Sequence, residues 1–402
     1  MAVFGSLRHL IVCNFPGAFL SFFFLVVAHA APADAQVAEG NRGQTVYFAG
    51  YGFASAAADV SQRFPNISAA LADSEFNFDR ALYGDLADNR DFGSFQITGD
   101  EKGKLGEGSG ALVLALVLDR ETTSVSKVGD KFKVLATISF SAMIFDFDSS
   151  EVLSAVPLSL TYVDLVSSPP SPDYLEDLYL RLTTAENSRS VRSLFWQALG
   201  DTVVPSNGSR RLRVTKVALP NDVDWADQQA LKIFGDDAAG ALSRFISRHF
   251  RIATLPYSNS QAISGKMAER IGNGEVFNFR IPEEDYSIEL SLDAFKKINT
   301  ASNAVGSVFV YGVFATISVK EPLTQRTLFE GAYKHGETRT VPVSVNDAPD
   351  WAAFEAVTEI LLEDLVKATG QVDKKWEKAH GAGKSHAAGN IAKFKEILDS
   401  CR

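Results

Sequence analysis

Residues 131–146 read KFKVLATISFSAMIFD, a long run in which large apolar side chains alternate with smaller or polar ones. Such period-two alternation predicts a β-strand. The polar residues 146–150 (DFDSS) predict a turn, and a second strand is expected over residues 152–160. The stretch therefore predicts a β-hairpin, around which the neighbouring elements can be placed.

The same order of elements occurs twice along the chain. Each copy has a strand, an amphipathic helix, a short strand, a variable loop, a strand that leads into a hairpin, and a closing helix. The parallel lies in the pattern, with few identities. The elements are expected at residues 46–51, 78–86, 94–97, 111–118, 131–160 and 191–199 in the first copy, and at 212–217, 238–246, 251–255, 286–292, 307–333 and 354–365 in the second, whose loop also holds a short helical piece at 260–271.

The two copies meet at a turn-rich string, PSNGS at residues 205–209, which has no apolar period. Helices packed on one face of each sheet are the natural cover for the apolar face of its strands. We therefore expect an α+β fold of two tandem domains, residues 40–205 and 206–372, each a small, mostly antiparallel sheet with helices on one face. The second domain is expected to be an internal repeat of the first, and the closing helix to stop at Gly370.

Residues 1–35 are expected to be a secretory signal peptide. Arg8 precedes an apolar run over residues 18–27, which is too short to span a bilayer comfortably. Small residues at the spacing of a cleavage site follow as AHA (28–30) and ADA (33–35). A retained N-terminal anchor is the alternative. We therefore expect an exported, periplasmic protein, with secretion as the alternative and no transmembrane segment in the mature chain.

The net charge and the cysteine content limit the classes of partner and the disulfides that we expect. The chain carries 39 Lys and Arg against 49 Asp and Glu, a net charge of −10 that lacks the broad basic surface phosphate backbones demand, so no nucleic-acid partner is expected. Cys13 lies inside the signal, before its main apolar run, which argues against a lipid-attachment site. Cys401 is then the one mature cysteine, either an incidental thiol or a candidate for an intermolecular disulfide.

The tail, residues 373–402, has seven Lys and Arg against four Asp and Glu, which reverses the sign of the rest of the chain. Past a Gly/Ala-rich hinge, Ile391, Phe394, Ile397 and Leu398 form an apolar stripe on a short helix. The stripe either packs on the second domain or docks to a partner protein or an anionic membrane surface. Peripheral membrane contact through the tail is part of the second hypothesis.

The order of elements, with residues 252–255 (IATL) after a helix and residues 350–370 closing after a hairpin, resembles the periplasmic TolB amino-terminal domain and the curli secretion lipoprotein CsgG. Two departures are visible, since neither the β-propeller of TolB nor the lipidated cysteine of CsgG is found. The resemblance implies a role in envelope assembly with unidentified envelope proteins as partners. It carries over no catalytic residue.

Motifs for catalysis, cofactors and metals are weak. GEGSG (106–110) has its serine one place out for a nucleophile elbow, and GAGKS (381–385) lacks the first glycine and the preceding strand of a P-loop. The histidines after the signal and the grouped carboxylates are expected to be solvated loop and turn residues: His249, His335, His380 and His386, and residues 146–148, 222–224 and 283–285. We therefore assign no catalytic residue, no cofactor and no metal ligand.

Two functional hypotheses follow. Under the first, the chain is a non-catalytic periplasmic binding or envelope-assembly adaptor protein. We lean towards this hypothesis and so against an enzyme. The second is an exported hydrolase that acts through carboxylates in a cleft between the two domains. A cleft near residues 205–225 with converging carboxylates of raised pKa would favour the hydrolase, and a flat surface there would favour the adaptor.

Overall fold

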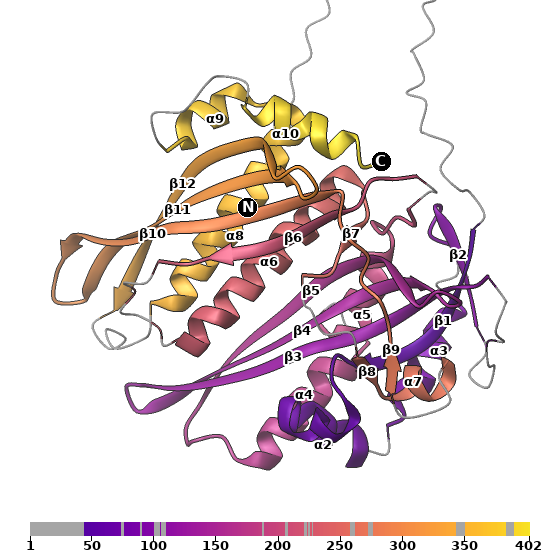
Figure 1. Cartoon of the computed structure of the whole chain (residues 1–402). Coiled ribbons are helices and arrows are strands. Elements are labelled where there is room, and N and C mark those ends of the chain that lie inside the picture. The colour runs from indigo at the N-terminus through magenta and orange to yellow at the C-terminus, as the bar shows by residue number, and fades with distance from the viewer. Residues whose placement is uncertain are drawn as a thin grey trace, which may run out of the picture. The chain divides into compact units, whose positions relative to one another are not determined.

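The computed structural model of the chain describes residues 44–73, 76–88, 91–99, 105, 110–186, 189–205, 208–220, 223, 226, 228–257, 262–271, 276–342, 350–382 and 390–402. The expected signal peptide lies outside these residues. The hairpin over residues 131–160 is confirmed. Strand β4 (Lys131–Asp146) pairs antiparallel with β5 (Glu151–Val166) (Figure 1). In their register, Ser139 stands opposite Ser159.

The first sheet continues from this hairpin. Strand β3 (Leu112–Val128) pairs antiparallel with β4 and parallel with β1 (Gln44–Phe53), which in turn pairs parallel with β2 (Phe95–Thr98). A β-bulge in β1 contains Gly50, whose φ is +93°. A Cβ atom at Gly50 would lie 2.5 Å from Asp79 Oδ1, so glycine is required there both for the backbone conformation and for the space.

The second sheet has the same strand order. Strands β10 (Tyr286–Ser302), β11 (Gly306–Glu321) and β12 (Arg326–Pro342) form an antiparallel meander, and β10 pairs parallel with β6 (Leu212–Ala218), which pairs parallel with β7 (Thr254–Leu255). The chain is therefore an α+β protein with two mainly antiparallel sheets, as expected. That the second half is a repeat of the first in sequence stays a prediction.

Helices cover one face of the first sheet. Their apolar side chains form a core with Phe48, Leu114, Ile138 and Phe140 from the strands. These helices are η1 (Ala57–Asp59), α1 (Val60–Arg63), α2 (Pro65–Asp73), α3 (Phe78–Leu86), α4 (Pro172–Thr184) and α5 (Val191–Leu199). Helix α4 is absent from the elements predicted from the sequence, although Ser171 at its N-cap and Pro172 in its first turn are ordinary helix-start signals.

Two long helices cover one face of the second sheet. Helix α6 (Gln228–Phe250) and helix α8 (Trp351–Gln371) share a core with β10, β11 and β12 (Figure 1). Helix α8 runs one residue past the expected stop at Gly370. Val372 provides the left-handed cap instead, with φ of +51°.

A segment from the second half of the chain crosses to the first sheet. Strand β8 (Ala262–Ser264) pairs with β1, and β9 (Val276–Asn278) pairs with β8. Between them, α7 (Lys266–Ile271) buries Met267 and packs on the face of the sheet opposite α2–α5. The expected helical piece at 260–271 is thus a strand followed by a helix where it is described, and the domain boundary at 205/206 stays a prediction.

An ion pair fastens this crossing segment to the first sheet. Arg270 of α7 donates to Asp79 Oδ2 at 2.8 Å and to the Ala49 carbonyl at 2.8 Å, and its guanidinium lies over the Tyr83 ring. Both charged side chains of the pair are about nine-tenths buried. Because a buried charge without its partner is costly, α7 is held to β1 and α3 by this contact.

The tail packs on its own chain. Helix α9 (Lys374–His380) is followed by α10 (Asn390–Asp399), and Ile391, Phe394, Ile397 and Leu398 all lie in the core of the second sheet. Phe394 stacks on Phe329 of β12, with ring centroids 4.8 Å apart. A docking role for these four side chains would therefore require α10 to leave this core, and that role stays a prediction.

We predict that Phe394→Ala lowers the free energy of unfolding by about 3 to 5 kcal/mol, because it removes a fully buried ring and leaves a cavity. Chemical denaturation of the mature protein measures this change. Lys393→Ala, at the exposed neighbouring position, is the control and should change stability by less than about 0.5 kcal/mol. Equal stabilities for the two variants would show that α10 does not contribute to the core.

Candidate functional site

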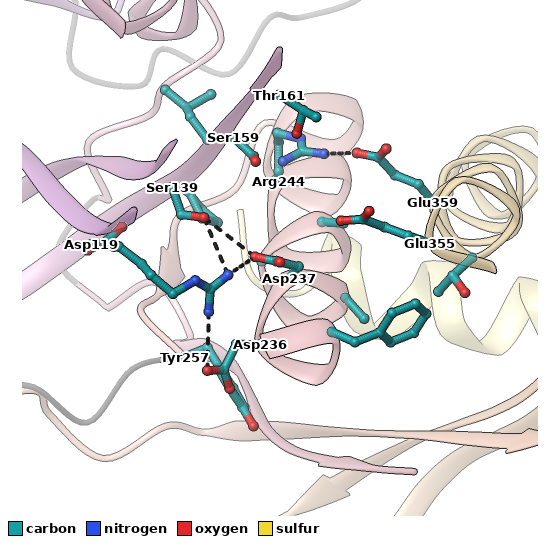
Figure 2. Close-up of a pocket in the computed structure, with 18 of the residues that line it drawn as sticks. Asp119, Ser139, Ser159, Thr161, Asp236, Asp237, Arg244, Tyr257, Glu355 and Glu359 are labelled. Atoms are coloured by element: carbon teal, nitrogen blue, oxygen red, sulfur yellow. Dashed lines mark hydrogen bonds and ion pairs between the residues drawn. The ribbon is translucent and has the colours of Figure 1, made fainter. Parts of the chain in front are cut away.

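A cavity of about 820 Å³ lies between the first sheet and the helices α6 and α8, and we call it the inter-sheet cleft (Figure 2). Its volume is in the range of small-molecule sites. One wall is the face of β4 and β5 that α2–α5 leave uncovered. The other wall is formed by α6 and α8 on the sides turned away from the second sheet.

Hydroxyl groups line the sheet wall. Ser139 and Ser141 of β4 and Ser159 and Thr161 of β5 face the cleft, while the intervening residues of β4, such as Phe140, are buried under the helices on the other face. Thr161 also shares a hydrogen bond with Thr137, at 3.2 Å. The alternation within TISFSA (137–142) therefore separates an apolar core face from a hydroxyl-bearing cleft face.

Charged side chains line the helix wall. Asp237 and Arg244 project from α6, and Glu355 and Glu359 from α8, where their spacing of four residues places them on one face. Arg244 pairs with Glu359. Helix α6 passes β5 at Gly240, where an added Cβ atom would make an ordinary van der Waals contact with Pro157 Cβ at 3.7 Å. The two helices thus present a mainly acidic surface to the hydroxyl wall.

Arg120 joins the two walls. It follows a β-bulge in β3, and its guanidinium reaches across to Asp237 and, at 3.4 Å, to Asp236 of α6 (Figure 2). Ser139 donates to the same Asp237 carboxylate at 3.4 Å. Within the described part of the chain, Arg120 Nε is buried without a hydrogen-bond partner. This ion pair holds α6 at a set distance from the first sheet.

Burial raises the pKa of several carboxyl groups in the cleft. The pKa of Glu355 rises to about 7, mainly through burial and then through the neighbouring charges of Asp237 and Glu359. Burial also raises the pKa of Asp119 to about 6. The pKa values of Asp236 and Asp237 are raised by burial as well, although Arg120 counteracts the shift. Clefts in which carboxyl groups have raised pKa values are candidate functional sites.

Thr215 lines the inter-sheet cleft and lies within residues 205–225, where the hydrolase hypothesis places its cleft. The sequence alone does not indicate the acidic residues on α6 and α8. Asp237 and Glu355 are far apart in the sequence, and each sits on the polar side of an amphipathic helix, so no local spacing marks them. The available signal was the serine and threonine pattern of β4 and β5.

The carboxylates and histidines weighed from the sequence lie elsewhere. Asp146 caps its own turn by accepting from Ser149, and Asp285 accepts from the Arg211 amide at 2.7 Å. His249 ends α6, and burial lowers its pKa. His335 contacts Glu337 at 2.8 Å, whereas His386 and residues 222 and 224 lie outside the described residues. None of the described groups enters the cleft.

Two further candidates concern metals and the thiol. Among the described residues, no three His, Cys, Asp or Glu side chains lie close enough together to ligate one metal ion. Cys401 is buried, and burial raises the pKa of its thiol to about 12. An intermolecular disulfide would require this thiol to become exposed and ionised, so that assignment stays a prediction.

Comparisons with known proteins return structures but no family. No protein-family model and no curated protein matches the chain. A minor lipoprotein from Acinetobacter baumannii is 8% identical, with a TM-score of 0.18, over 44% of this chain and 97% of its own. A Xanthomonas campestris protein of the family DUF330 is 13% identical, with a TM-score of 0.22, over 43% and 94%. The PelC dodecamer from Paraburkholderia phytofirmans is 12% identical, with a TM-score of 0.18, over 40% and 87%.

None of these three is TolB or CsgG, and at such identities and scores the likeness carries no functional argument. A separate finding concerns the membrane. Among the helices of the described residues, none is long and apolar enough to span a bilayer.

We predict that Glu355→Gln flattens the dependence of stability on pH. A carboxyl group whose pKa is raised on folding stabilises the folded state below its ordinary pKa of 4.5, and this stabilisation is lost as pH rises through about 7. Between about pH 5 and pH 8 the wild type should lose about 1 to 2 kcal/mol more than the variant, after screening by solvent. Denaturation at both pH values measures the difference, and parallel losses would contradict the assignment.

Proposed function

We propose that the chain is an exported, non-catalytic binding protein of the bacterial envelope, and that the inter-sheet cleft is its ligand site. The observation that carries the proposal is a cavity of about 820 Å³ between two packed layers, whose walls carry hydroxyl and charged side chains among apolar ones. Packed layers in proteins are normally filled by apolar side chains. A hydroxyl wall and a charged wall that face each other across open space favour the binding of a polar ligand.

The arrangement of the carboxyl groups favours binding over catalysis. Glu359, Asp236 and Asp237 are engaged in ion pairs with arginines, which leaves Asp119 and Glu355 as candidates for acid–base chemistry. A carboxylate hydrolase needs one protonated acid and one ionised base, and therefore two environments that separate their pKa values. Burial shifts the pKa of Asp119 and that of Glu355 in the same direction.

The hydrolase remains the second candidate because one observation favours it. Asp119 and Glu355 both line the cleft, and their raised pKa values of about 6 and about 7 are near those at which a carboxyl group works as a general acid. A screen of the purified protein against polysaccharides and peptidoglycan tests this function. Turnover that Glu355→Gln abolishes would replace the binding assignment.

Export and envelope assembly rest on the sequence. The signal-like residues 1–35 support delivery to the periplasm, with secretion as the alternative, and the resemblance to TolB and CsgG supports contact with other envelope proteins. The matching strand order of the two sheets supports an internal duplication of residues 40–205 in 206–372. The partner protein is unidentified, and no cofactor is assigned.

We predict that Ser159→Trp blocks ligand capture, because it places an indole at an exposed position on the hydroxyl wall. The mature protein is incubated with a small-molecule extract of periplasm and separated by gel filtration, and the compounds it retains are identified by mass spectrometry. At least one compound should be enriched on the wild type about tenfold over the variant.

The control is Thr340→Trp, at an exposed position on β12 outside the cleft, which should retain the compound. A far-ultraviolet spectrum and a melting temperature for both variants establish that they are folded. Failure of the wild type to enrich any compound over Ser159→Trp would remove the cleft as a ligand site.

A further inference from the structure

The arrangement of charged side chains within the inter-sheet cleft bears on which ligand fits. The cations that line the cleft are mostly engaged by other groups, and Arg63 donates to the Ala54 carbonyl at 2.7 Å. Arg120 is bound to Asp236 and Asp237, and Arg244 is bound to Glu359. Lys232 acts on Asp236, one turn along α6, and Lys133 lies six residues from Ser139 on β4, which is about 20 Å along an extended strand.

Glu355 is a carboxylate of the cleft that pairs with none of these cations. Within the described part of the chain it forms no hydrogen bond and no ion pair. The charges that act on it most strongly are Asp237 and Glu359, both of its own sign, and Arg120 offsets them in part. A partly buried carboxylate flanked by two others is unfavourable as an ion, and a cation placed beside it would relieve both the burial and the repulsion.

The kind of cation follows from the geometry. Among the described residues, no three carboxylate, imidazole or thiol groups lie close enough to share a metal ion. The cleft walls therefore do not favour a metal ion as the bound cation. A protonated amine carries three N–H donors that point in different directions, so it can reach carboxylates that are spread around it. Figure 2 shows Glu355, Glu359 and Asp237 on the α6 and α8 side, with Ser159 and Ser139 on the facing strands.

The opposite wall of the cleft indicates the chemistry of the rest of the ligand. Ser139, Ser159 and Thr161 present hydroxyl groups that can donate and accept hydrogen bonds, and they lie along β4 and β5 rather than at one point. The cleft follows β5 from Pro157 to Val163, a distance of about 20 Å for an extended strand. A hydroxylated ligand matches such a wall, because each hydroxyl group can form more hydrogen bonds than the ones that Ser139 and Thr161 already make within the protein.

We propose that the inter-sheet cleft binds a small hydroxylated amine, whose ammonium group is held by Glu355 between Asp237 and Glu359 and whose hydroxyl groups contact Ser139, Ser159 and Thr161. This inference rests on the proposed binding function and names the chemical class of its ligand.

The test uses two sugars that differ in one charge. Glucosamine carries an ammonium group, and N-acetylglucosamine has the same ring with a neutral amide in its place. Isothermal titration calorimetry of the mature protein should show that glucosamine binds about tenfold more tightly than N-acetylglucosamine. Glu355→Gln should weaken glucosamine binding about tenfold and abolish the difference between the two sugars.

Glu363→Gln is the matched control. It lies on the same helix, two turns after Glu355, pairs with Lys367 and does not line the cleft, so both affinities should be unchanged. Ser159→Trp should abolish the binding of glucosamine. Equal affinities for the two sugars, unaltered binding by Glu355→Gln, or no heat from glucosamine at millimolar concentrations would each overturn the inference.

The failure of this inference can be told apart from failure of the proposed function. If periplasmic extract yields a compound that Ser159→Trp excludes and that compound has no amine, the cleft is a ligand site and the amine assignment is wrong. If no extract compound and no sugar depends on Ser159, the binding function fails together with the inference.

Discussion

Helix α6 packs against both sheets, and each of its sides has the chemistry of the sheet it meets. Toward the second sheet it contributes apolar residues such as Leu242 and Phe245 to the core. Toward the first sheet it contributes Asp236, Asp237 and Arg244 to the inter-sheet cleft. The amphipathic pattern of one helix therefore decides where the interior is filled and where it stays open.

The Arg120 ion pair follows from this arrangement. The side of α6 that carries Asp236, Asp237 and Arg244 meets the hydroxyl-bearing face of β4 and β5, so the contact depends on charge as well as on apolar burial. Arg120 supplies this charge interaction by bridging to Asp236 and Asp237. The cleft remains because the hydroxyl groups of one wall and the charged groups of the other do not interdigitate as a core would.

The crossing segment shows a second constraint. Residues 262–271 and 276–278 come from the second half of the chain and extend the first sheet through β8 and β9, while α7 covers its apolar face. Arg270 and Asp79 fix this cover in a buried ion pair. The two halves are therefore coupled by this crossing segment as well as by the cleft. A truncation at residue 205 would remove the part of the first sheet's core that α7 and β8 provide.

The sequence by itself determined the local elements. Period-two alternation marked β4, β5, β11 and β12, and the spacing of apolar residues marked α3, α5, α6 and α8, because these signals depend on neighbours in the chain. The stripe of α10 was also visible in the sequence. Its choice between partner and core was not, because that depends on the space beside Phe329 and α8.

Only the tertiary structure decided the site. Asp237 and Glu355 come together because two helices pack side by side, and Arg120 reaches them because a β-bulge turns it toward α6. Neither the shift of the Glu355 pKa nor the cleft has a local signature, since burial and the proximity of like charges are properties of the packed molecule. The hydroxyl face of β4 and β5, in contrast, is visible in the local sequence, within the same residues that predicted the hairpin.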